Sequence, residues 1–265
     1  MKYTAENFFL HYIPEYQLLI KSDFSTDTLI IVDKSQEVKA LYSYPSDAPD
    51  AEATKILGLP FRNVSISLPL QSFTLVPSAV FDNRYLSTYQ AFMQDDQLSR
   101  THARTLDALG ITGVFQYDLF LHKRWLGIFP QANFLAAFQV VLQAAQSYLS
   151  DTGNVLGIHL KDKQAEIFVF SGKELLLYNI FDVETGGDLQ YFLLTICNSL
   201  EIQPQFSQVL LSGMAEAHPF VDLAQQYGQV VQAMQARTSM HSSNIAVESY
   251  LHSVNLMADF QTCAS

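Results

Sequence analysis

Three side chains that could bind a metal lie close together within residues 154–170. They are His159, Asp162 and Glu166, and such imidazole and carboxylate groups form a site only when they converge within roughly 2 Å of one point. The stretch predicts two strands joined by a tight polar turn, which places His159 and Glu166 on adjoining strands and points Asp162 outward. The pattern therefore favours a solvated turn, and we predict no metal ligands.

Other arrangements that carry catalysis are missing from the sequence. It contains no Walker loop, no dinucleotide-binding glycine fingerprint, no Gly-x-Ser-x-Gly elbow and no His-Glu-x-x-His. No pair of a nucleophile and a base stands out either. We therefore predict no catalytic residues, although an enzyme of another class on the same scaffold stays open, because a fold does not fix a function.

The charge balance of the chain restricts its partners. The net charge is −11 and the sequence pI is about 4.9, whereas binding to a phosphate backbone or an anionic membrane needs clustered Lys and Arg side chains. The acidic residues are dispersed along the chain. We expect a soluble acidic protein that binds no nucleic acid.

Cysteine content and hydropathy bear on the cellular compartment of the protein and on membrane insertion. The two cysteines, Cys197 and Cys263, form no disulfide framework and no zinc quartet, which fits a reducing, cytoplasmic setting. The most apolar helix candidate, residues 134–149, is interrupted by glutamines and is too short to span a bilayer comfortably. We predict no membrane insertion.

The first half of the chain predicts a β-rich unit that opens with three antiparallel strands. Its apolar, β-branched runs are separated by short polar turns. The predicted strands are 17–22, 28–33, 37–44, 63–68 and 72–76, and the predicted helices are 51–57, 82–93 and 132–149. Residues 113–120 and 125–129 predict a further hairpin, whose turn carries His122, Lys123 and Arg124.

The second half predicts the same order of elements. The predicted strands are 155–160, 164–170, 173–180 and 207–211, and the predicted helices are 187–200, 219–227 and a C-terminal helix from about residue 243. The turn residues 150–153 suggest a boundary. We therefore expect two lobes, residues 1–150 and residues 151–265.

Two successive sets of three strands, a helix and a strand resemble a duplicated ribonuclease-H-like arrangement. This arrangement is the actin-like ATPase fold, an α/β architecture in which each lobe has a mixed five-stranded sheet covered by helices. The order of elements resembles an uncharacterised bacterial family of unknown function with this fold. A cytoplasmic actin-like protein of pilus assembly is a more distant resemblance.

The clearest resemblance lies in residues 157–170, GIHLKDKQAEIFVF, which align with the second phosphate loop of actin-like ATPases such as chaperones and sugar kinases. In that family an Asp organises Mg²⁺ and water, and glycines expose N–H groups to phosphate. Here His159 stands at the Asp position and Lys161, Asp162 and Lys163 stand at the glycine positions. The resemblance therefore implies a fold whose phosphate chemistry has been replaced.

Three other segments resemble nucleotide-binding parts of the family, and the first of them is better preserved than the second phosphate loop. Asp23-Phe24-Ser25-Thr26 is similar to the first phosphate loop, with Ser25 in place of a glycine, and is equally well interpreted as a polar β-turn. Gly186-Gly187 resembles the Gly-Gly before the helix in several members, and is equally well interpreted as a flexible helix entry. Residues 210–215, LLSGMA, resemble the adenosine motif, with Met214 in place of its second glycine.

Two functional hypotheses follow from this resemblance. The first is a non-hydrolysing actin-like protein, a pseudo-ATPase that acts by interaction or as a scaffold with an unidentified protein partner and no cofactor. The second is a nucleotide-binding protein that holds ATP and Mg²⁺ at a non-standard site between the lobes. The residues implied for that site are Asp23, Ser25, Thr26, Gly186, Gly187, Ser212 and Gly213.

Overall fold

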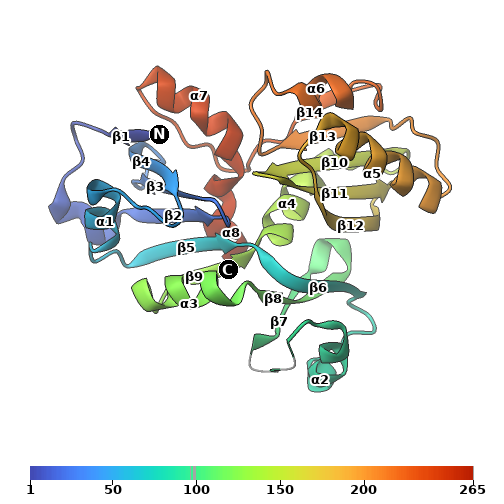
Figure 1. Ribbon diagram of the computed structural model, residues 1–265, viewed down its shortest axis with the longest axis horizontal. Coiled ribbons are helices and arrows are strands. Elements are labelled where there is room, and N and C mark those ends of the chain that lie inside the picture. Colours follow the sequence, from blue (N-terminus) through green and yellow to red (C-terminus); the bar gives the residue numbers. More distant parts are fainter. Residues whose placement is uncertain (96, 98–99, 265) are drawn as a thin grey trace. The chain divides into compact units, whose positions relative to one another are not determined.

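The structure is a computed structural model that describes residues 1–95, 97 and 100–264 (Figure 1). The packing of the backbone divides the chain into two compact units. Unit 1 contains Met1–Val140 and the chain end from Asp259, and unit 2 contains Val141–Ala258. The sequence-based boundary near residue 150 stays a prediction about the lobes.

The main sheet of unit 1 has six strands in the order β1-β4-β3-β2-β5-β9. Strands β1 to β4 pair antiparallel, whereas β2-β5-β9 pair parallel. Their bounds are Lys2–Thr4 (β1), Gln17–Ser22 (β2), Thr26–Val32 (β3), Val38–Pro45 (β4), Asn63–Leu68 (β5) and Asn133–Ala136 (β9). The sequence did not predict β1 or β9 as strands, and the predicted strand 72–76 belongs to a different sheet.

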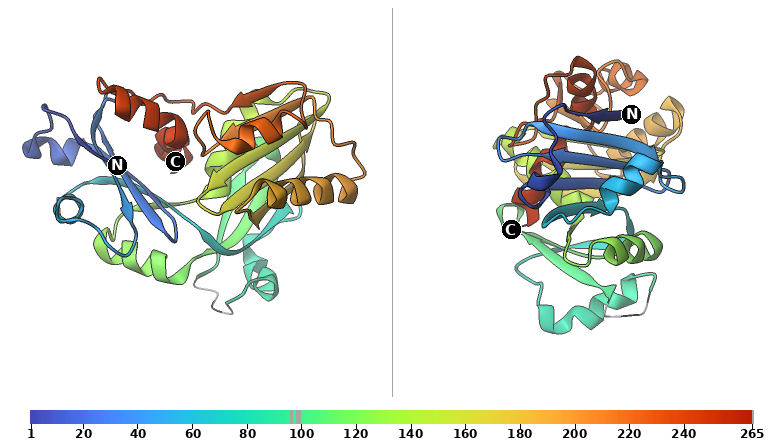
Figure 2. Two further views of the ribbon diagram at one scale, coloured as in Figure 1. Left: turned by 45° about the horizontal axis from the view of Figure 1, so that its top comes forward. Right: turned by 90° about the vertical axis from the view of Figure 1, so that its left-hand side faces the viewer.

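Two helical segments accompany this sheet. Helix α1 (Ala51–Leu57) begins as predicted, because the Asp50 side chain accepts hydrogen bonds from two N–H groups of its first turn. The 3₁₀ helix η1 (Leu10–Glu15) precedes β2. The dark-blue N-terminal segment lies at one end of the blue strands in Figure 2.

A second, three-stranded antiparallel sheet of unit 1 has the order β6-β8-β7. Its strands are β6 (Leu70–Pro77), β7 (His102–Leu106) and β8 (Ile111–Tyr117), and the short 3₁₀ helix η5 (Asp107–Leu109) joins the last two. The predicted helix over 82–93 is broken into η2 (Asn83–Tyr85), α2 (Leu86–Tyr89) and η3 (Gln90–Phe92). Asp82 caps its start as expected.

The predicted hairpin at residues 113–129 is wrong in its second half. Residues Leu119–Ile128 form helix α3, which begins at Asp118, whose carboxylate accepts a hydrogen bond from Leu121 N–H at 2.9 Å. Leu121 and Trp125, one helical turn apart, are both buried. This single buried stripe outweighs the β-propensity of the aromatic and β-branched residues around it.

The predicted helix over 132–149 is wrong at its start. Residues Asn133–Ala136 form β9, which pairs parallel with β5. The helix α4 then spans Ala137–Ala145 and continues into the 3₁₀ turn η6 (Gln146–Tyr148). The Gln139 side chain accepts a hydrogen bond from Ala136 N–H at 3.1 Å and fixes the change from strand to helix.

Unit 2 has a five-stranded sheet in the order β12-β11-β10-β13-β14. Strands β10, β11 and β12 are antiparallel neighbours, and β10, β13 and β14 run parallel. Their bounds are Asn154–Lys161 (β10), Gln164–Ser171 (β11), Glu174–Asp182 (β12), Gln208–Ser212 (β13) and Val231–Ala233 (β14). Both large sheets thus contain the strand order expected for a ribonuclease-H-like lobe.

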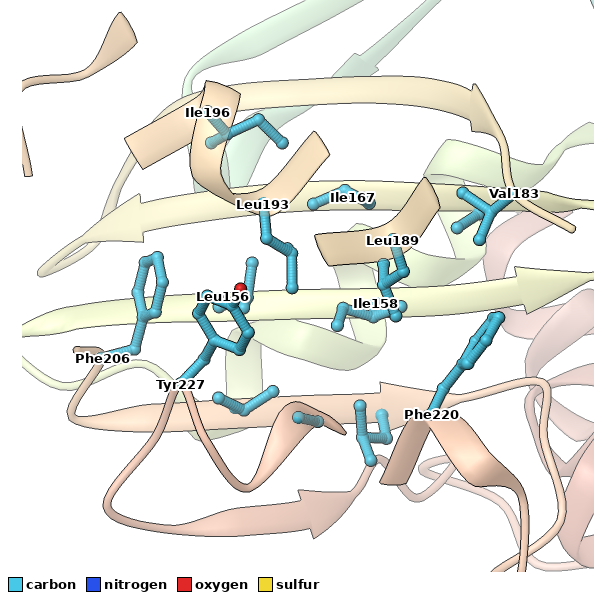
Figure 3. Close-up of a cluster of buried hydrophobic side chains, with 14 of the residues drawn as sticks. Leu156, Ile158, Ile167, Val183, Leu189, Leu193, Ile196, Phe206, Phe220 and Tyr227 are labelled. Carbon is cyan, nitrogen blue, oxygen red and sulfur yellow. The ribbon is translucent and has the colours of Figure 1, made fainter. Parts of the chain in front are cut away.

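One face of this sheet forms the main core of unit 2. Leu156 and Ile158 of β10 and Ile167 of β11 pack against α5 (Gly186–Ser199) and α6 (Pro219–Ala224) (Figure 3). Figure 2 shows α5 running along this face. Because successive residues of a strand alternate between its two faces, Gly157, His159 and Lys161 lie on the opposite face.

The chain ends in three short helical segments. Helix α7 spans Ile245–Val254, η7 spans Asn255–Asp259 and α8 spans Phe260–Ala264. The predicted C-terminal helix from residue 243 is therefore one α-helix that begins after the Asn244 cap, followed by two separate turns. In the described part of the chain, every helix is too short or too polar to cross a membrane.

Candidate functional site

The β2–β3 turn, where the sequence predicts a first phosphate loop, is closed by its own backbone. Asp23 N–H donates to Thr26 O at 2.9 Å, which makes the segment a tight hairpin turn. Ser46 donates to the turn twice, from N–H to Ser25 O and from its hydroxyl to Asp23 O, both at 2.9 Å. The Asp23 carboxylate lies 3.3 Å from the Lys21 ammonium. The charge of Asp23 is therefore already paired.

Directly beneath this turn, a buried ion pair joins β3 to α3. The Asp27 side chain is 2% exposed, and both its oxygens accept hydrogen bonds from Arg124 Nη2, at 2.8 and 2.9 Å. The hydroxyls of Ser22 and Ser46 also donate to Asp27, at 2.6 and 3.0 Å. Arg124, predicted to lie in a solvated turn, instead lies on α3 and donates hydrogen bonds to Asp27 and to the carbonyl of Ser46.

The electrostatics of Asp27 result from two opposed effects. Burial raises the pKa of its carboxyl group above the ordinary value, and the Ser22 hydrogen bond and the Arg124 charge lower it in part. The same carboxylate, with burial as the larger cause, raises the pKa of the Tyr44 hydroxyl, which faces Asp27 across β3 and β4. The arrangement is a structural network centred on one carboxylate, in which the Tyr44 hydroxyl and Arg124 Nε are buried without a hydrogen bond to any described residue.

A second buried ion pair occupies the β10–β11 hairpin, where the sequence aligns with the second phosphate loop. The Lys161 ammonium lies 2.5 Å from Glu166 Oε1, and Glu166 is fully buried. The Tyr178 hydroxyl of β12 donates to Glu166 Oε2 at 2.5 Å. Burial, and then the Glu166 charge, raise the pKa of Tyr178. The prediction that Lys161 is solvated is therefore wrong.

His159, which stands at the position of the Asp of actin-like ATPases, forms a hydrogen bond to the neighbouring strand of the sheet. Its Nδ1 lies 2.8 Å from the Ser212 hydroxyl, and the two residues are directly opposite in the parallel β10–β13 pair. Both side chains are buried. This contact ties the carboxyl ends of two parallel strands together. Asp162, as predicted, is exposed at the turn, with a φ of 44°.

Gly157 has a packing explanation rather than a phosphate-binding one. A Cβ atom at this position would lie 1.8 Å from the ring of Phe168, its direct neighbour on β11. Phe168 thus lies flat against the backbone of β10, and a side chain at position 157 would displace it.

The segment Ser212-Gly213-Met214 at the end of β13 is also fixed by packing. Gly213 has a φ of +75°, and a Cβ atom there would lie 2.1 Å from the carbonyl oxygen of Leu160. Met214, which replaces the family's second glycine, is 9% exposed and belongs to the core of unit 2. The glycine is needed for the turn itself, whether or not a ligand binds.

The Gly186-Gly187 pair at the start of α5 has no such requirement. A Cβ atom at Gly186 would meet nothing within 4 Å, and at Gly187 only the Thr185 hydroxyl at 3.5 Å. Thr185 and Asp188 form a complete capping box at this helix start. Three N–H groups that could otherwise face a phosphate, those of Glu184, Thr185 and Asp188, bond to side chains of the box.

A pocket of about 250 Å³ opens at the carboxyl ends of β13 and β14. Its lining includes Ser212, Ala215 and Glu216 after β13, Gln232 on β14 and His252 on α7. The carboxyl ends of parallel strands are common ligand sites in open α/β sheets. The volume is below the usual range of about 300–1,000 Å³ for pockets that take drug-sized ligands.

The residues predicted from the sequence divide between the two units. Asp23, Ser25 and Thr26 belong to unit 1, whereas Gly186, Gly187, Ser212 and Gly213 belong to unit 2. Within unit 2 the last four follow the same edge of the sheet, because β12 and β13 both run parallel to β10. Their role in nucleotide binding stays a prediction.

Sequence reasoning missed Asp27, Arg124, Ser46 and Tyr178 as members of the two buried networks. Only Asp27 carried a usable signal, since it is an acidic residue at the start of an apolar strand. In the part of the chain that the structure describes, no group of three or more His, Cys, Asp or Glu side chains could hold a metal ion.

Gly213, which has no room for a side chain, and Gly186, which has room, allow a direct test of whether packing requires these glycines. We expect Gly213→Ala to lower the free energy of unfolding by about 1–3 kcal/mol, because it strains the backbone and collides with Leu160. Gly186→Ala, the matched control in the same unit, should be neutral or slightly stabilising. Urea unfolding followed by circular dichroism checks both, and equal effects of the two substitutions would contradict the account.

Known structures share the fold of this chain at low sequence identity. A Bacteroides thetaiotaomicron protein with an actin-like ATPase fold and unknown function is 15% identical and superposes with a TM-score of 0.68, over 94% of this chain and 98% of that chain. A chain of the PilM–PilN type IV pilus biogenesis complex is 11% identical, with a TM-score of 0.60 and the same coverage. The protein therefore has the actin-like ATPase fold.

Its family is defined at the level of sequence as well. No curated protein matches the chain. The family described as "Protein of unknown function (DUF3822)" matches residues 6–231, which is most of the chain. The protein belongs to this family of unknown function.

Proposed function

We propose that this chain is an actin-like protein that does not hydrolyse ATP and acts through contacts with another protein. The observation that carries the proposal is the Lys161–Glu166–Tyr178 network in the β10–β11 hairpin. The hairpin that would grip phosphates in an ATPase of this fold contains an internally neutralised ion pair instead. The Asp that organises Mg²⁺ in actin-like ATPases is replaced by His159, whose ring bonds to the Ser212 hydroxyl.

The first turn supports the same proposal. Phosphoryl transfer depends on backbone N–H groups and cations that stabilise developing negative charge. Here the nearest guanidinium, that of Arg124, already forms hydrogen bonds to Asp27, Ser22 and the Ser46 carbonyl. A triphosphate would have to compete with a buried carboxylate for this cation. These side chains therefore do not fit a Mg²⁺–ATP complex bound as in actin-like ATPases.

Two further findings favour an interaction role in the cytoplasm. The structurally similar chain from the PilM–PilN complex belongs to a protein assembly. Cys197 and Cys263 are both buried thiols, and no disulfide joins them, which suits a reducing compartment. The acidic charge of −11 disfavours nucleic acid as the partner.

Calorimetric titration with ATP and Mg²⁺ tests the proposal. We expect no saturable heat at micromolar protein and no release of inorganic phosphate above the buffer rate, because neither phosphate turn offers an unpaired cation. A working actin-like ATPase measured under the same conditions serves as the positive control. Micromolar binding together with phosphate release would overturn the proposal.

A second candidate function is the binding of a nucleoside without hydrolysis, which the 250 Å³ pocket favours. The pocket adjoins residues 212–215, which align with the adenosine motif of actin-like ATPases. Ala215 in its lining is exposed. Titration with adenosine tests it. Binding that Ala215→Trp abolishes would support this function, and absence of binding to the unmodified protein would exclude it.

A further inference from the structure

A groove of about 440 Å³ lies in unit 1 between the N-terminal segment and the β3–β4 turn. One wall consists of the aromatic rings of Phe9, Tyr12 and Tyr16, and the other contains Asp33, Lys34 and Ser35. None of these residues belongs to either of the two phosphate-loop positions. The volume is within the range of about 300–1,000 Å³ found for ligand pockets.

The aromatic wall is exposed and is already formed. Phe9 and Tyr12 are 48% and 44% exposed, whereas Tyr16 is 5% exposed and anchors the row from inside. Ring centroids follow one another at 6.4 Å from Phe9 to Tyr12 and at 6.3 Å from Tyr12 to Tyr16. The N–H groups of Tyr12 and Tyr16 bond back to Phe9 O and Tyr12 O, which fixes the spacing of the rings.

The charged groups of the groove are neutralised within the protein. Lys34 pairs with Glu15 at 2.7 Å across the groove, and the Lys39 ammonium pairs with Asp33 at 3.1 Å and with Glu37 at 2.5 Å. Asp33 also accepts hydrogen bonds from the Ser35 hydroxyl and N–H and from Glu37 N–H. A charged ligand would have to break the Lys39–Asp33 pair, whose Lys39 side chain is buried, whereas a neutral ligand leaves that pair intact.

We propose that this groove binds a neutral, proline-containing segment of a partner protein in the polyproline II conformation. Such a segment has no internal hydrogen bonds and loses little conformational entropy on binding, and its pyrrolidine rings pack on aromatic faces. Its free carbonyl groups can accept hydrogen bonds from the Tyr12 hydroxyl and the Asn7 amide. The inference rests on the proposed interaction function and names the chemistry of the partner.

Fluorescence anisotropy of the full chain with a labelled oligoproline peptide of about ten residues tests the proposal. We expect saturable binding that Tyr12→Ala weakens at least about tenfold, as removal of a central aromatic anchor does. Phe120→Ala is the matched control, because Phe120 is a 79% exposed aromatic residue of α3 in the same unit. It should leave the affinity unchanged.

Salt and a second peptide separate this occupant from others. The affinity should change less than about twofold between about 0.05 and 0.5 M NaCl, since no charge is exchanged on binding. A Gly-Ser peptide of equal length should not bind. Failure of the oligoproline peptide to bind, a strong salt dependence, or a dimer that Tyr12→Ala dissociates in sedimentation would each overturn the proposal. None of these results depends on whether ATP binds, which is measured separately.

Discussion

Replacing Lys161 with alanine is expected to lower the free energy of unfolding of unit 2 by about 3–5 kcal/mol. The Lys161 ammonium is the cationic partner of Glu166, whose side chain has no exposed surface. Without Lys161, the buried Glu166 carboxylate keeps the hydrogen bond from the Tyr178 hydroxyl but loses its counter-charge. A buried charge without its counter-charge costs far more than a lost surface contact.

A double substitution isolates the cause. Lys161→Met combined with Glu166→Gln removes both charges and keeps an oxygen that can accept from Tyr178, so most of the lost stability should return. Lys163→Ala is the control, because the neighbouring Lys163–Glu184 pair is exposed and should contribute nothing measurable.

The measurement must resolve the two units. Hydrogen exchange of peptides covering β10 to β12 reports unit 2, whereas the fluorescence of Trp125, the one tryptophan of the sequence, reports unit 1. We expect Lys161→Ala to accelerate exchange in unit 2 and to leave the Trp125 transition in place. A loss no larger than that of Lys163→Ala would mean that Glu166 is solvated, and would contradict the network.

Replacing Arg124 with methionine is expected to destabilise unit 1 by about 3–5 kcal/mol at neutral pH. Arg124 is the cationic partner of Asp27, which is 2% exposed, and it also donates to the Ser46 carbonyl at 2.9 Å. Methionine keeps much of the side-chain volume, so the loss reports the charge rather than a cavity. The β2–β3 turn should loosen with it, because Ser46 holds that turn.

The loss should depend on pH in a defined direction. The pKa of Asp27 in the folded protein is already raised by burial, and removal of Arg124 raises it further. A carboxyl group with a raised pKa binds its proton more tightly in the folded state, so its contribution to stability is highest at low pH and falls as the pH rises through that pKa. Arg124→Met should therefore be less destabilising at about pH 4.5 than at about pH 7.5.

A charge-removing partner substitution provides the control for this second prediction. Adding Asp27→Asn to Arg124→Met should restore much of the stability at neutral pH and abolish the pH dependence. Unfolding is best followed by circular dichroism, because Arg124 stacks on Trp125 at 4.8 Å and its loss changes the fluorescence directly. A destabilisation that is independent of pH, or that Asp27→Asn does not relieve, would contradict the account.

Much of the fold could be predicted from local patterns in the sequence. Strands β2, β5 and β13 and helices α1 and α5 lie within one or two residues of their predicted bounds. The reason is physical, since alternation, polar turns and caps such as Asp50 act over a few residues. Doubling of the strand order was also visible, and it correctly indicated the actin-like fold.

Two of the errors in unit 1 have a common origin. Residues 125–129 were predicted as a strand and 133–136 as a helix, whereas 125–128 are helical and 133–136 form a strand. Their intrinsic preferences are weak, and the outcome depends on partners distant in sequence. β9 is a strand because β5 offers it a parallel edge, and α3 is a helix because Leu121 and Trp125 are buried together.

The sequence by itself determined that the second phosphate loop is replaced, because His159, Lys161, Asp162 and Lys163 stand where an actin-like ATPase needs Asp and glycines. Only the tertiary structure decided what the replacements do. Lys161 is buried against Glu166, and Arg124 reaches Asp27 from 97 residues away. No local pattern could reveal the Arg124–Asp27 pair, whereas Lys161 and Glu166 lie in one predicted hairpin and only the tertiary structure decides that their pair is buried.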